Sequence, residues 1–175
     1  MGIREDEIQR LIHYGKGLGV KIVIYNKTKA GSAAEWTIDG SLIEVYAGGN
    51  KSKTTIILDL IHELAHHIWF IHEKNRQPDL KFEEAIDRAN LYQIETDAIT
   101  PKHLRKKIYD VEVAGTGYWD IIYKDTNLKI PKWKVEASKV FDIWMYQVYY
   151  ENGHFPKGKV RSDYYKEVQA KYKPS

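Results

Sequence analysis

The segment LDLIHELAHHIWF, residues 58–70, is the most informative stretch of this 175-residue chain. Together with Ile57, its apolar residues Leu60, Leu64 and Ile68 recur at spacings of three and four, the pattern of one face of an α-helix. We therefore expect a single helix from about Ser52 to Glu73.

Within this helix, residues 62–66 form the pattern His-Glu-x-x-His. Because His62 and His66 are four residues apart, their imidazoles lie on one helix face and can bind the same ion. Glu63 is rotated by about 100° from His62, so it lies beside the ion, where it can accept a proton from a metal-activated water. The pattern predicts Zn²⁺ as cofactor, His62 and His66 as ligands, and Glu63 as catalytic base. The alternative is an ordinary amphipathic helix with surface histidines.

The polar neighbours of the motif have weaker roles in this interpretation. His67 and His72 lie off the ligand face, so we expect neither to bind the metal; His67 is expected at the helix surface or in contact with a ligand. Asp59 precedes His62 by three residues. It could orient an imidazole by a hydrogen bond, or it could be an ordinary solvated carboxylate.

A catalytic zinc site needs a third protein ligand, which we expect to be a carboxylate from a later helix. Glu95 is the first candidate because its helical neighbours at three and four residues are apolar, where an uncompensated carboxylate would be costly. Glu136 is the rival, although Lys132 or Lys139 could pair with it on a surface. Asp97, Asp142, Glu84 and other carboxylates remain as further candidates.

The rest of the chain predicts an α+β fold, in which a small antiparallel or mixed sheet with a β-hairpin packs on helices. Further helices are expected at Arg4–Tyr14, Phe82–Ile99, Trp133–Asn152 and Ser162–Tyr172. Strands are expected at Val20–Tyr25, Glu35–Ile38 and Leu42–Tyr46, the last two joined by Asp39-Gly40 as a hairpin. The Leu42–Tyr46 strand is expected to offer an edge to an extended peptide. The region Tyr109–Lys129 is mixed and turn-rich and receives no assignment.

Composition narrows the class of protein. Hydrophobic residues make up 43% and charged residues 29% of the chain, which is typical of a soluble globular protein. We expect one domain over residues 1–175, with a core of about 1–101 and a helical part of about 102–175. The absence of cysteine excludes disulfides, thiolate zinc sites and cysteine nucleophiles.

Charge and hydropathy bear on partners and location. A net charge of only +3 argues against nucleic acid as the main partner, although the Lys-rich stretch Lys157–Lys173 leaves DNA binding as a minor alternative. No apolar run is long enough for a membrane span, and the N-terminus lacks a signal peptide, so we expect a cytoplasmic protein. Nothing in the sequence indicates the oligomeric state.

The order of the elements resembles that of the ImmA/IrrE-like zinc metallopeptidases: a β-hairpin, then a helix carrying HELAHH, then a helix carrying a carboxylate. This gluzincin-like family occurs in bacteria, phages and mobile elements. In that family a Glu-x-x-Ala string supplies the third ligand, and Glu95-Thr96-Asp97-Ala98 is similar to it. The resemblance covers about residues 20–101. It implies a zincin-like fold, the ligands His62, His66 and Glu95, the base Glu63, and a protein or peptide substrate.

The sequence thus predicts a zinc-dependent metallopeptidase that hydrolyses peptide bonds through a metal-activated water. The competing hypothesis is a zinc-binding interaction module of the same fold that performs no turnover.

Overall fold

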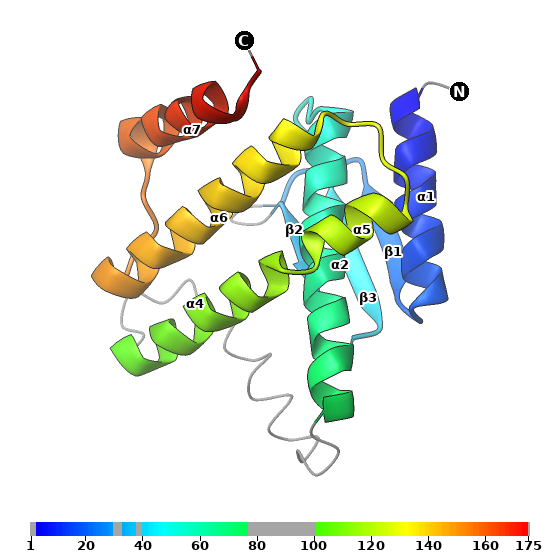
Figure 1. The fold of residues 1–175 in the computed structure, drawn as a ribbon, viewed down its shortest axis with the longest axis horizontal. Helices are drawn as coiled ribbons and strands as arrows, with labels where there is room; N and C mark the ends of the chain where they lie inside the picture. The colour runs from blue at the N-terminus through cyan, green and yellow to red at the C-terminus, as the bar shows by residue number, and fades with distance from the viewer. Residues whose placement is uncertain (1–2, 30–32, 38–39, 77–100, 175) are drawn as a thin grey trace.

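The computed structural model describes residues 3–29, 33–37, 40–76 and 101–174 (Figure 1). Its helices are α1 (Ile3–Gly17), α2 (Lys53–Arg76), α4 (Lys102–Thr116), α5 (Trp119–Asp125), α6 (Lys132–Asn152) and α7 (Gly158–Tyr172), and its strands are β1 (Lys21–Tyr25), β2 (Ala34–Trp36) and β3 (Leu42–Tyr46). This confirms an α+β protein with a small sheet. The expected helix Phe82–Ile99, which contains Glu84, Glu95 and Asp97, lies outside the described residues.

The three strands form one mixed sheet in the order β1-β3-β2. β2 and β3 are antiparallel, as expected of a hairpin, whereas β1 runs parallel to β3 with Ile22 opposite Ile43. The expectation that β3 offers an edge is wrong, because β3 hydrogen-bonds to β1 on one side and to β2 on the other. β2 is an outer strand of this sheet instead.

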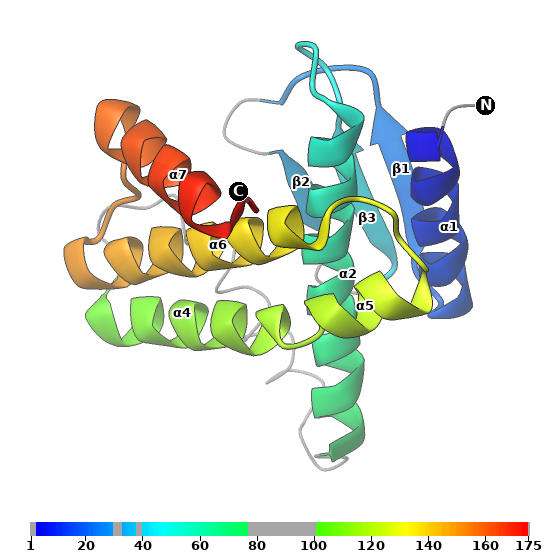
Figure 2. The ribbon, with the colours of Figure 1, turned by 45° about the horizontal axis from the view of Figure 1, so that its top comes forward.

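Helix α2 occupies the middle of the fold. In Figures 1 and 2 the strands lie behind α2 and α5 crosses in front of it, and α1, α4, β2 and β3 also contact α2. This position follows from the sequence, since Leu60, Ile61 and Leu64 are fully buried and apolar residues cover more than one side of the helix. Among the described residues, however, no helix is long and apolar enough to cross a bilayer.

The C-terminal part of the chain shares the core formed around α2. Trp119 and Ile122 of α5 and Val135 of α6 are buried in the same cluster as Leu11 of α1 and Ile43 of β3. Residues 109–129, which the sequence left unassigned, are largely helical and form the end of α4 and all of α5. The glycines of this region do not interrupt α4. Gly115 lies inside the helix, and Gly117 follows its last turn.

Helices α6 and α7 confirm the elements expected at Trp133–Asn152 and Ser162–Tyr172. Pro131 precedes α6, and Gly153 ends it in the left-handed conformation (φ 79°), which glycine adopts without a steric penalty. Helix α7 begins earlier than expected, at Gly158, and packs along α6 (Figures 1 and 2). The rings of Trp144 and Tyr164 stack between these two helices with centroids 4.0 Å apart.

The loop between α5 and α6 is fixed to α1 by one buried carboxylate. Glu7 has no exposed surface, and its Oε1 accepts hydrogen bonds from the backbone N–H groups of Lys129 and Ile130, the latter at 2.7 Å. Its other oxygen pairs with Arg4 at 2.8 Å. Because these bonds compensate the buried charge, Glu7 joins α1 to the loop between α5 and α6 without leaving an unpaired carboxylate.

Candidate metal centre

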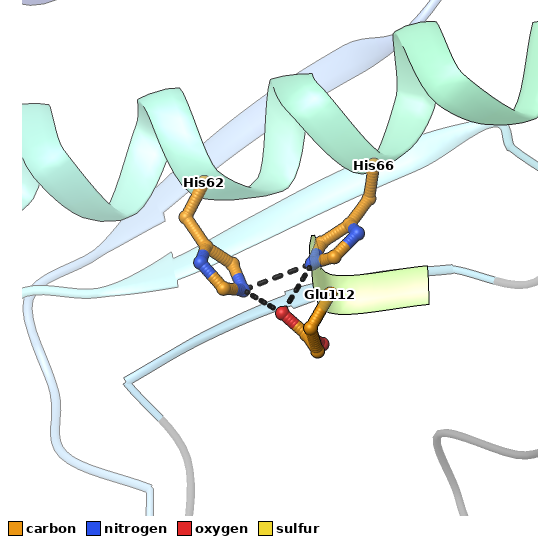
Figure 3. Close-up of side chains that lie close together, drawn as sticks. All are labelled: His62, His66 and Glu112. Carbon is orange, nitrogen blue, oxygen red and sulfur yellow. Dashed lines mark hydrogen bonds and ion pairs between the residues drawn. The ribbon is translucent and has the colours of Figure 1, made fainter. Parts of the chain in front are cut away.

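Three potential ligand atoms from α2 and α4 converge at one point (Figure 3). The Nε2 atoms of His62 and His66 are 2.9 Å apart. Oε2 of Glu112 lies 3.6 Å from the first nitrogen and 3.4 Å from the second. These three residues therefore lie close enough together to hold one metal ion.

The spacing of the three atoms suits a tetrahedral ion. Zinc–nitrogen and zinc–oxygen bonds of about 2.0–2.2 Å place neighbouring ligand atoms about 3.3–3.5 Å apart at tetrahedral angles. The three measured separations bracket this value. An ion could therefore be accommodated by small movements of side chains that already point at one another.

The surroundings of Glu112 are an independent indication of a metal-binding role. Its side chain is only 2% exposed, and its carboxylate faces the imidazoles of His66 and His62 at 3.4 and 3.6 Å and the Tyr146 side chain. A buried carboxylate needs such partners, because leaving it without any cation nearby costs several kcal/mol, on the order of the penalty for breaking a buried ion pair. Burial raises the pKa of Glu112, but the His66 and His62 imidazoles lower it overall, so the group is held as the anion that a metal requires.

Gly115 allows α4 to approach the imidazole of His66. A Cβ atom at this position would lie 3.1 Å from Nδ1 and 3.3 Å from Cε1 of His66, closer than ordinary van der Waals contact. Gly115 is one turn beyond Glu112 on the same face of α4. The glycine therefore lets the helix that carries the carboxylate pack directly against the histidine helix.

Glu63 lies beside the two histidines on α2, and its side chain is largely buried. Burial raises the pKa of its carboxyl above the usual value, and this outweighs the lowering by the neighbouring His62 and His66. A raised pKa brings a carboxylate closer to the range in which it can both accept and return a proton near neutral pH. This is the environment expected of a catalytic base.

The second nitrogen of His62 faces another carboxylate. Oδ2 of Asp142, from α6, lies 3.5 Å from His62 Nδ1. Burial lowers the pKa of His62, but Asp142, Glu112 and Glu63 together raise it well above the usual value. The surroundings of this imidazole therefore favour a positive charge, whether from a proton or from a metal ion.

Asp59, the other carboxylate considered near His62, has a different partner. Its Oδ2 lies 2.5 Å from Nζ of Lys51, which precedes α2. Burial raises the pKa of Asp59 even though Lys51 acts in the opposite direction. The sequence suggested that Asp59 could orient the His62 ring. In this structure Asp142 lies in that position instead.

A cleft of about 470 Å³ opens beside the metal-ligand cluster. Its lining includes His62 and Glu63 from α2, Asp142 from α6, Ala34 from the outer strand β2, and Arg161 from α7. A ligand in this cleft would therefore reach one of the metal-binding imidazoles, the candidate base and an outer strand of the sheet at the same time.

His67 and His72 lie away from the cluster. His67 is buried, so the expectation that it lies at the helix surface is wrong. Its Nε2 lies 3.1 Å from the Leu18 carbonyl oxygen, and its Nδ1 accepts a hydrogen bond from Trp36 Nε1 at 3.3 Å. These contacts use both ring nitrogens and tie α2 to β2 and to the end of α1. His72 is exposed and lies against the Tyr118 ring, with centroids 5.4 Å apart.

The candidates for the third metal ligand differ in where they lie. Glu95 lies outside the described residues, so its assignment stays a prediction. Glu136 pairs with Lys132 at 3.2 Å and with Lys139 at 3.3 Å, the surface arrangement that the sequence suggested for it. The sequence analysis missed Glu112, because it assigned no element to that region. The available signal was a single carboxylate within the apolar run Val111–Ala114.

Comparison of the chain with protein-family models, with curated proteins and with solved structures finds no significant match. The resemblance to ImmA/IrrE-like peptidases therefore stays a prediction from residues 20–101.

Proposed function

We propose that this protein is a zinc-dependent peptidase in which His62, His66 and Glu112 hold the metal and Glu63 is the catalytic base. The observation that carries the proposal is the buried Glu112 carboxylate, which faces the Nε2 atoms of His62 and His66 at 3.6 and 3.4 Å. Two imidazoles and one carboxylate are the ligand set of a well-known class of catalytic zinc sites, with a fourth position left for water or substrate.

The proposed chemistry assigns a separate task to each group. Bound zinc would act as a Lewis acid towards the scissile carbonyl and lower the pKa of water to near neutrality. Glu63 accepts a proton from the attacking water and returns it to the leaving amine. Asp142 holds the His62 ring in place through Nδ1.

The cleft gives the substrate a place to bind. An extended peptide in the cleft would run past β2, whose Ala34 lines it. The peptide-pairing role that the sequence analysis gave to β3 passes to β2, because β2 is an outer strand. Protection of β2 amides from hydrogen exchange on peptide binding would support this placement, and unchanged exchange would remove it.

Metal analysis of the purified protein tests the centre. We expect about one zinc per chain in the wild type, a loss of zinc in His66→Ala and Glu112→Gln, and retention in Glu136→Gln. Glu95→Gln belongs in the same series because the sequence singled out Glu95. Measuring all first-row divalent metals distinguishes zinc from iron, which also binds two histidines and a carboxylate. A wild type that holds no metal after reconstitution would eliminate the proposal.

Hydrolysis is tested with Glu63→Gln against the wild type, using a peptide library and mass spectrometry. We expect Glu63→Gln to keep its zinc and lose cleavage, because the amide cannot accept the proton. Equal cleavage by the two proteins would refute the role of Glu63. Zinc binding without cleavage of any peptide by the wild type would favour the interaction module instead.

A further inference from the structure

The cleft contains two cationic side chains that the proposed chemistry does not use. Lys157 immediately precedes α7, Arg161 lies one turn into it, and both line the cleft. In the part of the chain that the structure describes, neither side chain forms an ion pair with a carboxylate. The Arg161 guanidinium lies over the Phe141 ring instead, 5.9 Å from its centroid.

The carboxylates of the cleft do not account for these cations. Asp59 is paired with Lys51 at 2.5 Å, and Asp142 faces the His62 ring at 3.5 Å. Glu63 lies beside the metal-ligand cluster. Because neither Lys157 nor Arg161 is paired with these acidic groups, both remain available to an anionic group on the bound molecule.

The remaining lining of the cleft is largely apolar. Large side chains dominate this part of the wall: Leu58, Phe141, Met145, Phe155 and Pro156. Because Arg161 lies against Phe141, the cationic part borders the apolar wall directly. A ligand that fills both regions needs a bulky apolar group with an anionic group close to it.

We propose that the cleft selects peptides in which a bulky apolar side chain lies within a few residues of a carboxylate that Lys157 and Arg161 bind. Each extended residue spans about 3.3–3.6 Å, so one or two residues bring the carboxylate from the apolar wall to the cations. The carboxylate is an acidic side chain or the C-terminus of the peptide. This inference rests on the proposed peptidase function and specifies its substrate class.

Peptide hydroxamates test the proposal by affinity rather than turnover, because the hydroxamate group chelates zinc and fixes the orientation of the peptide. Each peptide of the series has a leucine followed by one variable residue. This residue is Asp-amide, Asn-amide, Lys-amide, or Asn with a free C-terminus. On the zinc-loaded protein we expect calorimetry to give Asp-amide a Kd about fivefold to tenfold lower than Asn-amide, and Lys-amide the highest Kd. The free C-terminus tests the other source of the carboxylate.

Charge-reversed variants identify the residues responsible. In Lys157→Glu/Arg161→Glu the order should reverse, with Lys-amide binding more tightly than Asp-amide. The matched control is Lys159→Glu/Lys166→Glu, which changes the net charge equally at exposed positions of α7 that do not line the cleft. The control should keep the wild-type order. Equal Kd values for Asp-amide and Asn-amide in the wild type, or a reversal in the control, would overturn the proposal.

The same peptides with a carboxamide in place of the hydroxamate separate this inference from the metal proposal. Their binding to metal-free protein requires no zinc, so the comparison of Asp with Asn remains valid if the metal centre proves wrong. A preference for Asp that disappears in Lys157→Glu/Arg161→Glu supports the role of the two cations alone. No preference in either peptide series contradicts it.

Discussion

Asp142 of α6 lies 3.5 Å from Nδ1 of His62, while Nε2 of the same ring faces Glu112 at 3.6 Å. The imidazole is thus held between two carboxylates from different helices. Such an outer carboxylate fixes the orientation of a ligand histidine and makes its other nitrogen a stronger donor. The contact also links α6, which forms one wall of the cleft, to the metal-ligand cluster.

Replacing Asp142 with alanine should weaken zinc binding by about 10- to 100-fold, because the His62 ring loses its orienting partner. Competition with a chromophoric chelator measures the affinity. Asp142→Asn should lose less, since the amide oxygen can still accept a hydrogen bond. Glu136→Ala is the control on the same helix, because its carboxylate pairs with lysines. Zinc affinity unchanged in Asp142→Ala would show that the contact does not support the centre.

Gly115→Ala should also lower zinc affinity, because the new methyl group would meet His66 at 3.1 Å. Overpacking of this kind costs about 1–3 kcal/mol, which exceeds the gain of up to about 1 kcal/mol from better helix propensity. Gly17→Ala in α1 is the matched control, since nothing lies within 4 Å of a Cβ there. The same chelator competition and a urea titration measure both effects. Tight zinc binding by Gly115→Ala would mean that α4 yields without disturbing His66.

Zinc should stabilise the folded protein by mass action. At a free zinc concentration 100 times the Kd, the free energy of unfolding should rise by about 2.7 kcal/mol. Thermal unfolding with and without a chelator measures the change. The increase should vanish in His66→Ala and Glu112→Gln and persist in Glu63→Gln, whose carboxylate is not a proposed ligand. A Tm that rises equally in Glu112→Gln would place the zinc elsewhere.

Glu7→Ala should reduce the free energy of unfolding by about 2–4 kcal/mol, because it removes a buried carboxylate that accepts two backbone hydrogen bonds and pairs with Arg4. Urea denaturation provides the measurement. Glu5→Ala, which removes the exposed pair with Lys53, should cost less than about 1 kcal/mol. Equal losses in the two variants would mean that Glu7 does not anchor the loop between α5 and α6.

Local patterns account for the elements that the sequence predicted correctly. The apolar spacing over Ile57–Ile68 predicted α2, and the β-branched run at Val20–Tyr25 predicted β1. Pro131 and Gly153 bracketed α6, because proline and glycine act on the backbone of their own segment. Local patterns did not predict the order of the strands, because that order depends on which distant segments pair. The pairing of β1 with β3 removed the edge that the sequence assigned to β3.

By itself the sequence determined that His62 and His66 lie on one face of a helix with Glu63 beside them, because four residues make about one helical turn wherever that helix packs. The tertiary structure decided which carboxylate meets them. Glu112 reaches the two imidazoles because α4 packs against α2, and Gly115 leaves room for that approach. Such a contact depends on the complementary shapes of two helices far apart in the chain, which no local pattern encodes.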